Sequence, residues 1–298
     1  MSQIFDALNQ SATERVGHGA REFSAAKELL QVVERKGVSP ALLSEPLAPA
    51  PAVDPVRPFP SVKVALPEHS KFVCFTEGES LAAEKFRFLA TRLRHMQQKR
   101  SIKRLVVSSS VTGEGKSMVA ANLACSLAAG KQRVLLVEGD LRRPSLAPQL
   151  GLQKLPGLSQ LLQGENNNLN IYQLENFRLC VLLAGDIHTN PLEFMEAGQL
   201  SSLMDQLSTG FDWVVIDSPP LLPLADTSIW MRLADGVLLV TRPGVTPKKQ
   251  LQRSFETVEQ SKLLGTVLNA STEASTNHYY HHYTARSSGS PAPSSNAK

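Results

Sequence analysis

A glycine-rich segment, Gly113–Ser117, contains the residue types that hold the phosphates of a nucleotide. Its glycines let backbone N–H groups curl around a phosphate, and a helix starting here adds partial positive charge. Lys116 supplies a mobile cation for the terminal phosphates, and the Ser117 hydroxyl is suited to ligate Mg²⁺. The expected contacts to ATP come from Thr112, Gly113, Glu114, Gly115, Lys116, Ser117 and Met118.

The surroundings of this segment are those of a P-loop. An apolar run over Arg104–Ser109 predicts a strand and Lys116–Ala129 predicts a helix, so strand, glycine loop and helix follow in order. Ser110 stands where the pattern G-x-x-x-x-G-K-[ST] has its first glycine. An accidental glycine-rich turn is the alternative, and further elements downstream argue against it.

The first of these elements is an apolar strand, expected over Arg133–Glu138, that delivers carboxylates at its end. Open α/β sheets bind ligands at the carboxyl ends of their strands. Glu138 and Asp140 are two apart, so both would point to one face if the strand geometry continued. Solvated loop charges are the alternative. Arg142 and Arg143, which follow, could contact phosphate or end the strand in solvent.

Later strands also end in polar side chains. The run Trp213–Asp217, followed by Ser-Pro-Pro, has the form of a Walker B strand, whose terminal acid holds Mg²⁺ directly or through water. A strand over Gly265–Asn269 ends in an amide that could contact an adenine edge, and helix or strand capping is its alternative role. The predicted metal ligands are Ser117, Asp140 and Asp217.

The elements that must position these residues follow from the hydrophobic pattern after Phe72. Short runs rich in Val, Leu and Ile alternate with longer amphipathic stretches, which is typical of a parallel sheet covered by helices on both faces. Strands are expected at Arg104–Ser109, Arg133–Glu138, Leu179–Leu183, Trp213–Asp217, Gly236–Thr241 and Gly265–Asn269. Helices are expected at Leu81–Gln98, Lys116–Ala129, Leu158–Leu162, Gly198–Leu207, Ala225–Leu233 and Lys248–Lys262. We predict an α/β fold with a doubly wound, mostly parallel sheet.

Composition divides the chain into four parts. Residues 1–36 carry apolar side chains at helical spacing and predict short amphipathic helices, which either pack on their own domain or dock on a partner. Residues 37–68 are rich in proline and predict a semi-rigid linker. Residues 69–270 are the expected nucleotide-binding domain. Residues 271–298 contain almost no large aliphatic side chains and predict a disordered tail.

The chain has 298 residues, a net charge of +4 and three cysteines. No block of like charges indicates a nucleic-acid arm, so we expect no nucleic-acid partner. The odd number of widely spaced cysteines favours reduced, buried thiols over disulfides or metal ligands. No apolar run reaches the roughly 18 to 20 residues of a membrane span. We therefore expect a cytoplasmic protein that reaches a membrane only through a partner.

Together, these motifs resemble those of the bacterial protein-tyrosine kinases of polysaccharide synthesis and export. A tail with tyrosines also fits the order of features in that family, and the opening segment Ser2–Leu8 is similar to that of its soluble members. The resemblance spans about residues 72–269 and rests on Gly113–Ser117, Glu138–Pro144, Asn190-Pro191 and Asp217–Pro220.

The resemblance implies a tyrosine autokinase whose P-loop fold is that of the partition-type ATPases, the deviant Walker type. It implies that Lys116 and Ser117 hold ATP·Mg²⁺, that Glu138 and Asp140 act on metal and acceptor, and that Asp217 completes the metal site. The implied catalytic residues are Lys116, Glu138, Asp140 and Asp217. The implied phosphate acceptors are tyrosines of the tail, here Tyr279, Tyr280 and Tyr283.

The resemblance also implies partners. Soluble members are usually activated by a separate membrane polysaccharide co-polymerase, for which Ser2–Leu8 and the linker are candidate contacts. Phosphoryl transfer is expected mainly in trans, between subunits of a homo-oligomer. The helix from Leu81 keeps Glu84 and Arg87 of the family's oligomerisation motif Glu-x-x-Arg-x-x-Arg, but it has Ala90 at the second arginine.

Other functions fit part of the pattern. A partition-type ATPase, switched by nucleotide and with water as the acceptor, would carry a lysine early in the P-loop, where Val111 stands. A nucleotide-binding regulator without catalysis would explain Glu138, because the resembling family usually has Asp there and the extra methylene alters the reach of the carboxylate. The intact charges at the other motif positions favour the kinase.

Overall fold

The computed structural model describes residues 59–68, 70–163, 170–186, 191–196, 198–222 and 225–270. The chain divides into two units, Met1–Pro49 and Ala50–Lys298, and the described residues all belong to the second. The expected N-terminal helices, the segment Ser2–Leu8, Asn190 and the tail with Tyr279, Tyr280 and Tyr283 lie outside the described residues.

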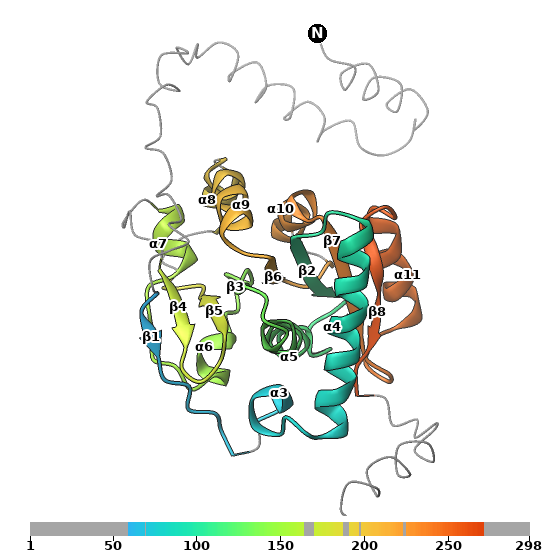
Figure 1. Ribbon diagram of the computed structural model, residues 1–298. Helices are drawn as coiled ribbons and strands as arrows, with labels where there is room; N and C mark the ends of the chain where they lie inside the picture. Colours follow the sequence, from blue (N-terminus) through green and yellow to red (C-terminus); the bar gives the residue numbers. More distant parts are fainter. Residues whose placement is uncertain are drawn as a thin grey trace, which may run out of the picture. The chain divides into compact units, whose positions relative to one another are not determined.

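Strands of the described residues form one sheet in the order β1-β4-β5-β3-β6-β2-β7-β8 (Figure 1). β4 and β5 are antiparallel, and every other neighbouring pair is parallel. The strands are β1 (Ser61–Val62), β2 (Arg104–Ser109), β3 (Val134–Glu138), β4 (Ile171–Leu174), β5 (Leu179–Leu182), β6 (Trp213–Asp217), β7 (Gly236–Thr241) and β8 (Leu263–Leu268). The prediction of a mostly parallel sheet is confirmed.

Helices cover both faces of the sheet. One core contains side chains of α3, α4, α5 and α6, and the other contains side chains of α7, α8, α9 and α10 (Figure 1). The helices are α3 (Val73–Thr76), α4 (Leu81–Lys99), α5 (Lys116–Ala129), α6 (Leu146–Gln149), α7 (Leu158–Leu162), α8 (Pro191–Glu196), α9 (Gln199–Gly210), α10 (Ala225–Leu233) and α11 (Lys248–Thr257).

Neighbouring residues of a strand enter different cores. In β2, Leu105 and Val107 belong to the core of α5, whereas Val106 belongs to the opposite core, as the alternation of side chains along a strand requires. β3 and β6 are buried along their whole length. Burial on both faces explains why these strands read in the sequence as continuous apolar runs.

The start of the domain differs from the prediction. Residues 37–68 are predicted to be a linker, but Ser61–Val62 forms β1 and pairs in parallel with β4. The ring of Phe59 stacks on Phe211 with 5.9 Å between ring centroids. Residues 59–68 therefore belong to the domain. The sequence did not predict this, because a strand of two residues at the edge of a sheet leaves no periodic signal among prolines.

The end of the domain also differs from the prediction. The helix expected over Lys248–Lys262 ends at Thr257, because Val258 is extended and its side chain is buried in the core. β8 begins at Leu263, which pairs with Val237 ahead of a shift in register. The short elements α3, α6, α8, β1 and β4 are not predicted from the sequence either.

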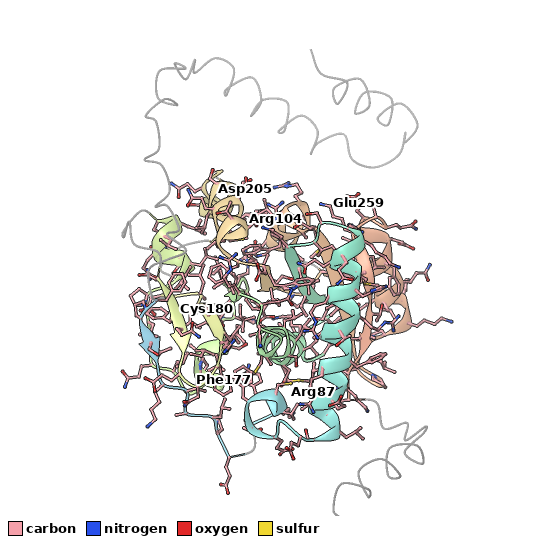
Figure 2. All side chains as sticks on the ribbon, in the orientation of Figure 1. Arg87, Arg104, Phe177, Cys180, Asp205 and Glu259 are labelled. Atoms are coloured by element: carbon pink, nitrogen blue, oxygen red, sulfur yellow. The ribbon has the colours of Figure 1, made fainter. Side chains whose placement is uncertain are left out.

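Charged side chains join the elements at the end of the sheet where β2 begins. Arg104 pairs with Asp205 of α9 at 2.9 Å and with Asp235, which precedes β7, at 3.1 Å (Figure 2). Burial raises the pKa of Asp235, but hydrogen bonds from Arg104 and Lys103 outweigh it and lower the pKa overall. This network fixes the end of the sheet opposite to the P-loop.

Two of the three cysteines are buried, as expected, and Cys74 is partly buried. The cysteines Cys74, Cys125 and Cys180 are free thiols, and burial raises the pKa of Cys125 to about 12 and that of Cys180 to about 11. Within the part of the chain that the structure describes, no helix combines the length and the apolar character needed to cross a membrane.

Gly139 lies where β3 approaches α10 too closely for a larger residue. A Cβ at this position would come within 2.8 Å of the Trp230 ring and 3.0 Å of Ile216. We expect Gly139→Ala to destabilise the protein by about 1–3 kcal/mol through overpacking, measured by urea unfolding. Gly78→Ala is the matched control, because nothing lies within 4 Å of its added Cβ. Equal losses for both variants would contradict this packing.

Candidate nucleotide-phosphate site

The P-loop joins β2 to α5 and has the left-handed backbone that its glycines permit. Gly113 has φ 84° and Gly115 has φ 89°, and Gly115 precedes the first residue of α5. Residues other than glycine rarely adopt this region, so the loop shape depends on these positions. Thr112 is exposed, Met118 is half-buried against the core and Ser117 is buried. Their placement along the loop and the first turn of α5 agrees with the motif.

Asn269 lies directly against this loop. Its side-chain amide donates to the backbone oxygen of Glu114 at 2.8 Å, and a Cβ on Gly115 would collide with it. The sequence places Asn269 only at the end of a late strand. The structure brings it to the P-loop because β8 and β2 flank β7 on either side.

The carboxylate of Glu114 points into the protein. It is fully buried, accepts the Val111 backbone N–H at 2.8 Å and accepts a hydrogen bond from the Thr246 hydroxyl. Arg242 donates to the backbone oxygen of Gly113 at 3.4 Å. Sequence analysis missed Thr246 and Arg242, because the segment after β7 has no motif that marks it as a neighbour of the P-loop.

Three motifs meet at one cluster of charges. The Lys116 ammonium lies 3.0 Å from Asp140 Oδ2, 3.3 Å from Asp217 Oδ1 and 3.3 Å from the Ser117 hydroxyl. Neighbouring β3 and β6 are parallel, with Glu138 in register with Asp217, so both strands deliver their acids to the same edge of the sheet. The cluster is thus a consequence of the strand order.

Burial of this cluster changes how its members hold protons. Burial raises the pKa of Asp217 to about 6, although the adjacent Lys116 and Ser117 lower it. Burial lowers the pKa of Lys116, but the Asp217 and Asp140 carboxylates outweigh it and raise the pKa overall. Without a nucleotide, the lysine therefore serves as the counter-ion of the two acids.

The same oxygen atoms fit a magnesium ion. Asp217 Oδ2 is buried and has no hydrogen-bond partner among the described residues, which leaves one carboxylate oxygen able to accept a cation. Mg²⁺ prefers oxygen ligands and is usually held by one or two carboxylates together with phosphate and water. Asp140 and the Ser117 hydroxyl complete an oxygen donor set of this kind.

Glu138 and Asp140 have different partners. The Glu138 side chain is 1% exposed and accepts hydrogen bonds from the backbone of Ser145, Leu146 and Ala184. Asp140 pairs with Lys116 and also accepts the Arg143 backbone N–H at 3.1 Å. Only one of the two acids therefore contacts the lysine.

Arg142 and Asp226 join the loop after β3 to α10. The guanidinium donates from Nε to Asp226 Oδ2 at 2.5 Å and from Nη2 to Oδ1 at 3.0 Å. Asp226 is buried in the first turn of α10. The sequence leaves two roles open for Arg142, contact with phosphate or a solvated strand end. The structure shows a different one, an ion pair with a buried acid.

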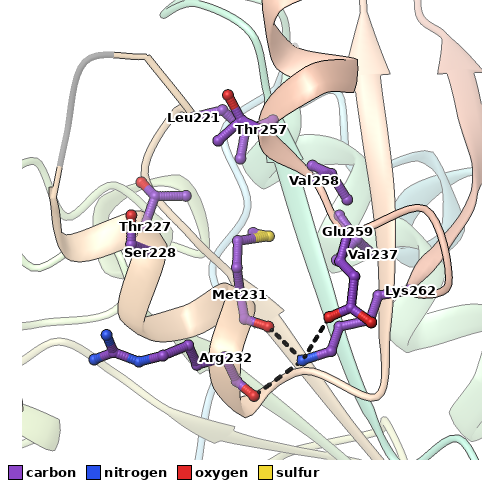
Figure 3. Close-up of a pocket in the computed structure, with 10 residues that line it drawn as sticks. All are labelled: Leu221, Thr227, Ser228, Met231, Arg232, Val237, Thr257, Val258, Glu259 and Lys262. Carbon is purple, nitrogen blue, oxygen red and sulfur yellow. Dashed lines mark hydrogen bonds and ion pairs between the residues drawn. The ribbon is translucent and has the colours of Figure 1, made fainter. Parts of the chain in front are cut away.

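A separate cavity lies on the other face of the sheet from α5. It has a volume of about 240 Å³ and lies between α10, β7 and the end of α11 (Figure 3). At its rim, Lys262 Nζ donates to the backbone oxygens of Met231 and Arg232 at 3.0 and 3.1 Å. These contacts cap the carboxyl end of α10. None of the predicted site residues lines this cavity.

The exposed face of α4 carries Glu84 and Arg87, which the family resemblance links to oligomerisation. Glu84 and Arg87 form an ion pair at 2.5 Å, and both side chains are about half exposed. Ala90 is fully buried in the core beneath the helix. Position 90 therefore has a packing role in this chain, and homo-oligomerisation stays a prediction.

Comparison with known proteins agrees with this geometry. Residues 101–291 match the ParA family, described as an NUBPL iron-transfer P-loop NTPase. The tyrosine-protein kinase YwqD of Bacillus subtilis is 34% identical over 200 residues, which cover 66% of this chain and 84% of that protein. The tyrosine-protein kinase CpsD of Streptococcus agalactiae is 30% identical over 174 residues, which cover 57% and 75%.

Solved structures show the same relationship. The kinase domain of the Escherichia coli tyrosine kinase ETK matches with a TM-score of 0.62 and 28% identity, over 69% of this chain and 82% of that domain. The fold, the P-loop and the charge cluster define a P-loop NTPase of the ParA type. Within this class, the chain belongs to the family of bacterial tyrosine-protein kinases.

Asp217→Asn should stabilise the nucleotide-free protein above about pH 6 and have little effect at about pH 4. Burial raises the pKa of Asp217 from 3.8 to about 6, so the folded protein holds this proton more tightly than the unfolded chain. The resulting stability is complete below the unfolded pKa and is lost as pH rises through the folded pKa. Asparagine carries no charge at any of these pH values, so the variant does not lose this stability as the pH rises. Melting temperatures of both proteins across this range test the prediction, and a constant difference would contradict it.

Proposed function

We propose that this chain is an ATP-dependent protein-tyrosine kinase that transfers the γ-phosphoryl group of ATP to Tyr279, Tyr280 or Tyr283 of its own tail. The observation that carries the proposal is the cluster at the P-loop, in which the Lys116 ammonium lies 3.0 Å from Asp140 and 3.3 Å from Asp217. Its relatives supply the acceptor class, since YwqD and CpsD are named tyrosine-protein kinases.

Binding of ATP rearranges the charges of the cluster. Lys116 exchanges its two carboxylate partners for phosphate oxygens, because a nucleotide at the P-loop brings more negative charge than Asp140 and Asp217 together. Asp217, with the Ser117 hydroxyl, is then available to hold Mg²⁺, and Asp140 is released to face both the metal and the acceptor. The metal supplies neutralisation of the charge on the terminal phosphates. The helix start at Lys116 adds backbone N–H donors to the same phosphates.

Asp140 is the better candidate for contact with the acceptor. A tyrosine hydroxyl has a pKa of about 10, so a carboxylate that orients it or takes its proton helps transfer at neutral pH. The new bond forms between the tyrosyl oxygen and the γ-phosphorus while the bond to the bridging oxygen of ADP breaks. The hydroxyl proton passes to the carboxylate. Asp140 is adjacent to Lys116, whereas Glu138 is occupied by backbone donors.

The proposed partner is a membrane polysaccharide co-polymerase. Some relatives are much longer than this chain, which covers only 22% of the succinoglycan biosynthesis transport protein ExoP of Rhizobium meliloti at 32% identity over 171 residues. The structure titled as the chimerical protein CapA2B2 also matches, with 28% identity and a TM-score of 0.63. Such relatives support a polysaccharide transport protein as activator, recruiting the kinase to the cytoplasmic face of the membrane. Ser2–Leu8 and the linker residues 37–58 are the candidate contacts.

Phosphosite mapping of the protein from its native host tests the proposed activity. Wild type should carry phosphate on Tyr279, Tyr280 or Tyr283, and Lys116→Met should lose it, because the lysine binds the transferred phosphoryl group. Lys154→Met is the matched control and should keep the modification, since this lysine is exposed and pairs with Asp186.

A contrary result has a defined meaning. An unmodified tail in wild type, together with ATP hydrolysed to inorganic phosphate, would replace the kinase by a nucleotide-switched ATPase of the ParA type. Bound ATP without turnover would indicate a nucleotide-binding regulator.

A further inference from the structure

The Glu138 carboxylate is enclosed by backbone donors. Its Oε1 accepts the N–H of Ser145 at 2.5 Å and of Leu146 at 2.6 Å, and its Oε2 accepts the N–H of Ala184 at 3.0 Å. A carboxylate has about four lone-pair directions. Most of them are thus used by the protein itself. The side chain is 1% exposed, so a tyrosyl hydroxyl has no open path to it.

These donors belong to two segments outside β3, and Glu138, the last residue of β3, binds both. Ser145 and Leu146 lie at the start of α6, and Ala184 lies just after β5. Hydrogen bonds from N–H groups to a charged carboxylate are stronger than those between neutral groups. Glu138 therefore ties the start of α6, at the end of the loop 141–146, to the end of the sheet.

The loop held in this way carries a hydroxyl into the metal site. Ser145 Oγ donates to Ser117 Oγ at 3.3 Å. Ser117 Oγ also lies 3.3 Å from Lys116 Nζ, which pairs with Asp217. The Glu138 carboxylate fixes the backbone of Ser145, and Ser145 fixes the hydroxyl that is expected to ligate Mg²⁺. The effect of Glu138 on the site thus runs through Ser145.

We propose that Glu138 is a positioning residue, and that Ser145, which it holds, is a second positioning residue that orients the Ser117 hydroxyl toward the metal. The proposal rests on the magnesium-nucleotide site of the proposed function. It changes the role that the family resemblance implies for Glu138, from contact with metal or acceptor to support of the loop beside them.

The two roles predict opposite rankings of two substitutions. Glu138→Gln keeps an Oε1 that accepts from Ser145 and Leu146 and loses only the acceptor for Ala184. Glu138→Asp keeps the charge but withdraws it by one methylene, so it cannot reach all of these donors. A positioning residue therefore tolerates Gln better than Asp. A base or metal ligand tolerates Asp better than Gln.

Amide hydrogen exchange measures the loop without any nucleotide. Glu138→Gln should keep protection at the Ser145 and Leu146 amides and lose it at Ala184, whereas Glu138→Asp should lose protection at all of them. Unchanged protection in both variants would contradict the proposal that Glu138 holds these segments in place. Hydrogen exchange needs no ligand, so it tests the role of Glu138 even if wild type fails to bind Mg²⁺·ADP. Such a failure of binding would contradict the proposed function and not the role of Glu138.

Calorimetry with ADP, in Mg²⁺ and in EDTA, measures the effect on the metal site. Ser145→Ala should weaken ADP binding about fivefold in Mg²⁺, the usual effect of one neutral hydrogen bond, and leave binding in EDTA unchanged. Glu138→Asp should have a similar effect, and the double variant should be no weaker than the larger single effect, since both act through one hydroxyl. Additive losses would overturn the proposed chain of contacts.

Single-turnover phosphorylation separates positioning from catalysis. Glu138→Gln should retain phosphoryl transfer to within about tenfold of wild type at saturating Mg²⁺·ATP. A loss of about 100-fold or more with ADP affinity unchanged would make Glu138 a catalytic base and contradict the proposal. Glu175→Gln is the matched control for charge removal, because Glu175 is exposed at the end of β4.

Discussion

The Lys116 ammonium lies between the carboxylates of Asp140 and Asp217, and the arrangement of the site depends on this contact. Two acids this close and this buried repel each other and cost desolvation energy, which the lysine offsets in the absence of nucleotide. The pKa of Asp217 is still raised, which means that Lys116 offsets only part of the desolvation energy of this carboxylate. In the proposed function, a nucleotide with Mg²⁺ would offer new partners to Lys116, Asp140 and Asp217 together.

The sheet determines which residues meet in this cluster. β3, β6 and β2 are neighbours and parallel, so the loops after them converge at one edge although their sequence positions are far apart. Packing keeps them there. Gly139 permits the close approach of Trp230, whose indole donates to the Gly139 backbone oxygen at 3.0 Å. Arg142 and Asp226 join the same loop to α10.

Much of this could be predicted from the sequence, and the physical reasons are visible in particular elements. β2, β6, β7, α5, α7 and α10 have the predicted bounds, because buried parallel strands and the helices that cover them have strong apolar patterns. The cluster of Lys116 with Asp140 and Asp217 follows from motif order and from the rule that parallel strands end at one edge. β1 and α6 could not be predicted, because elements of two and four residues have no period to detect.

The partners of individual side chains were harder to predict. Spacing indicates that Glu138 and Asp140 share a face, but the strand ends at Glu138 and the chain then turns, so their partners differ. The contacts of Thr246 with Glu114 and of Ser145 with Ser117 join segments that no local pattern connects. Such contacts depend on the course of loops, which sequence periodicity does not encode.

The fate of the γ-phosphate tests the kinase account most directly. Purified full-length chain is mixed with a substoichiometric amount of γ-labelled ATP and Mg²⁺, and the label is followed into phosphotyrosine and into inorganic phosphate. The account predicts that label enters phosphotyrosine before any inorganic phosphate forms. Label that passes straight to inorganic phosphate, with none on tyrosine at any time, would contradict it.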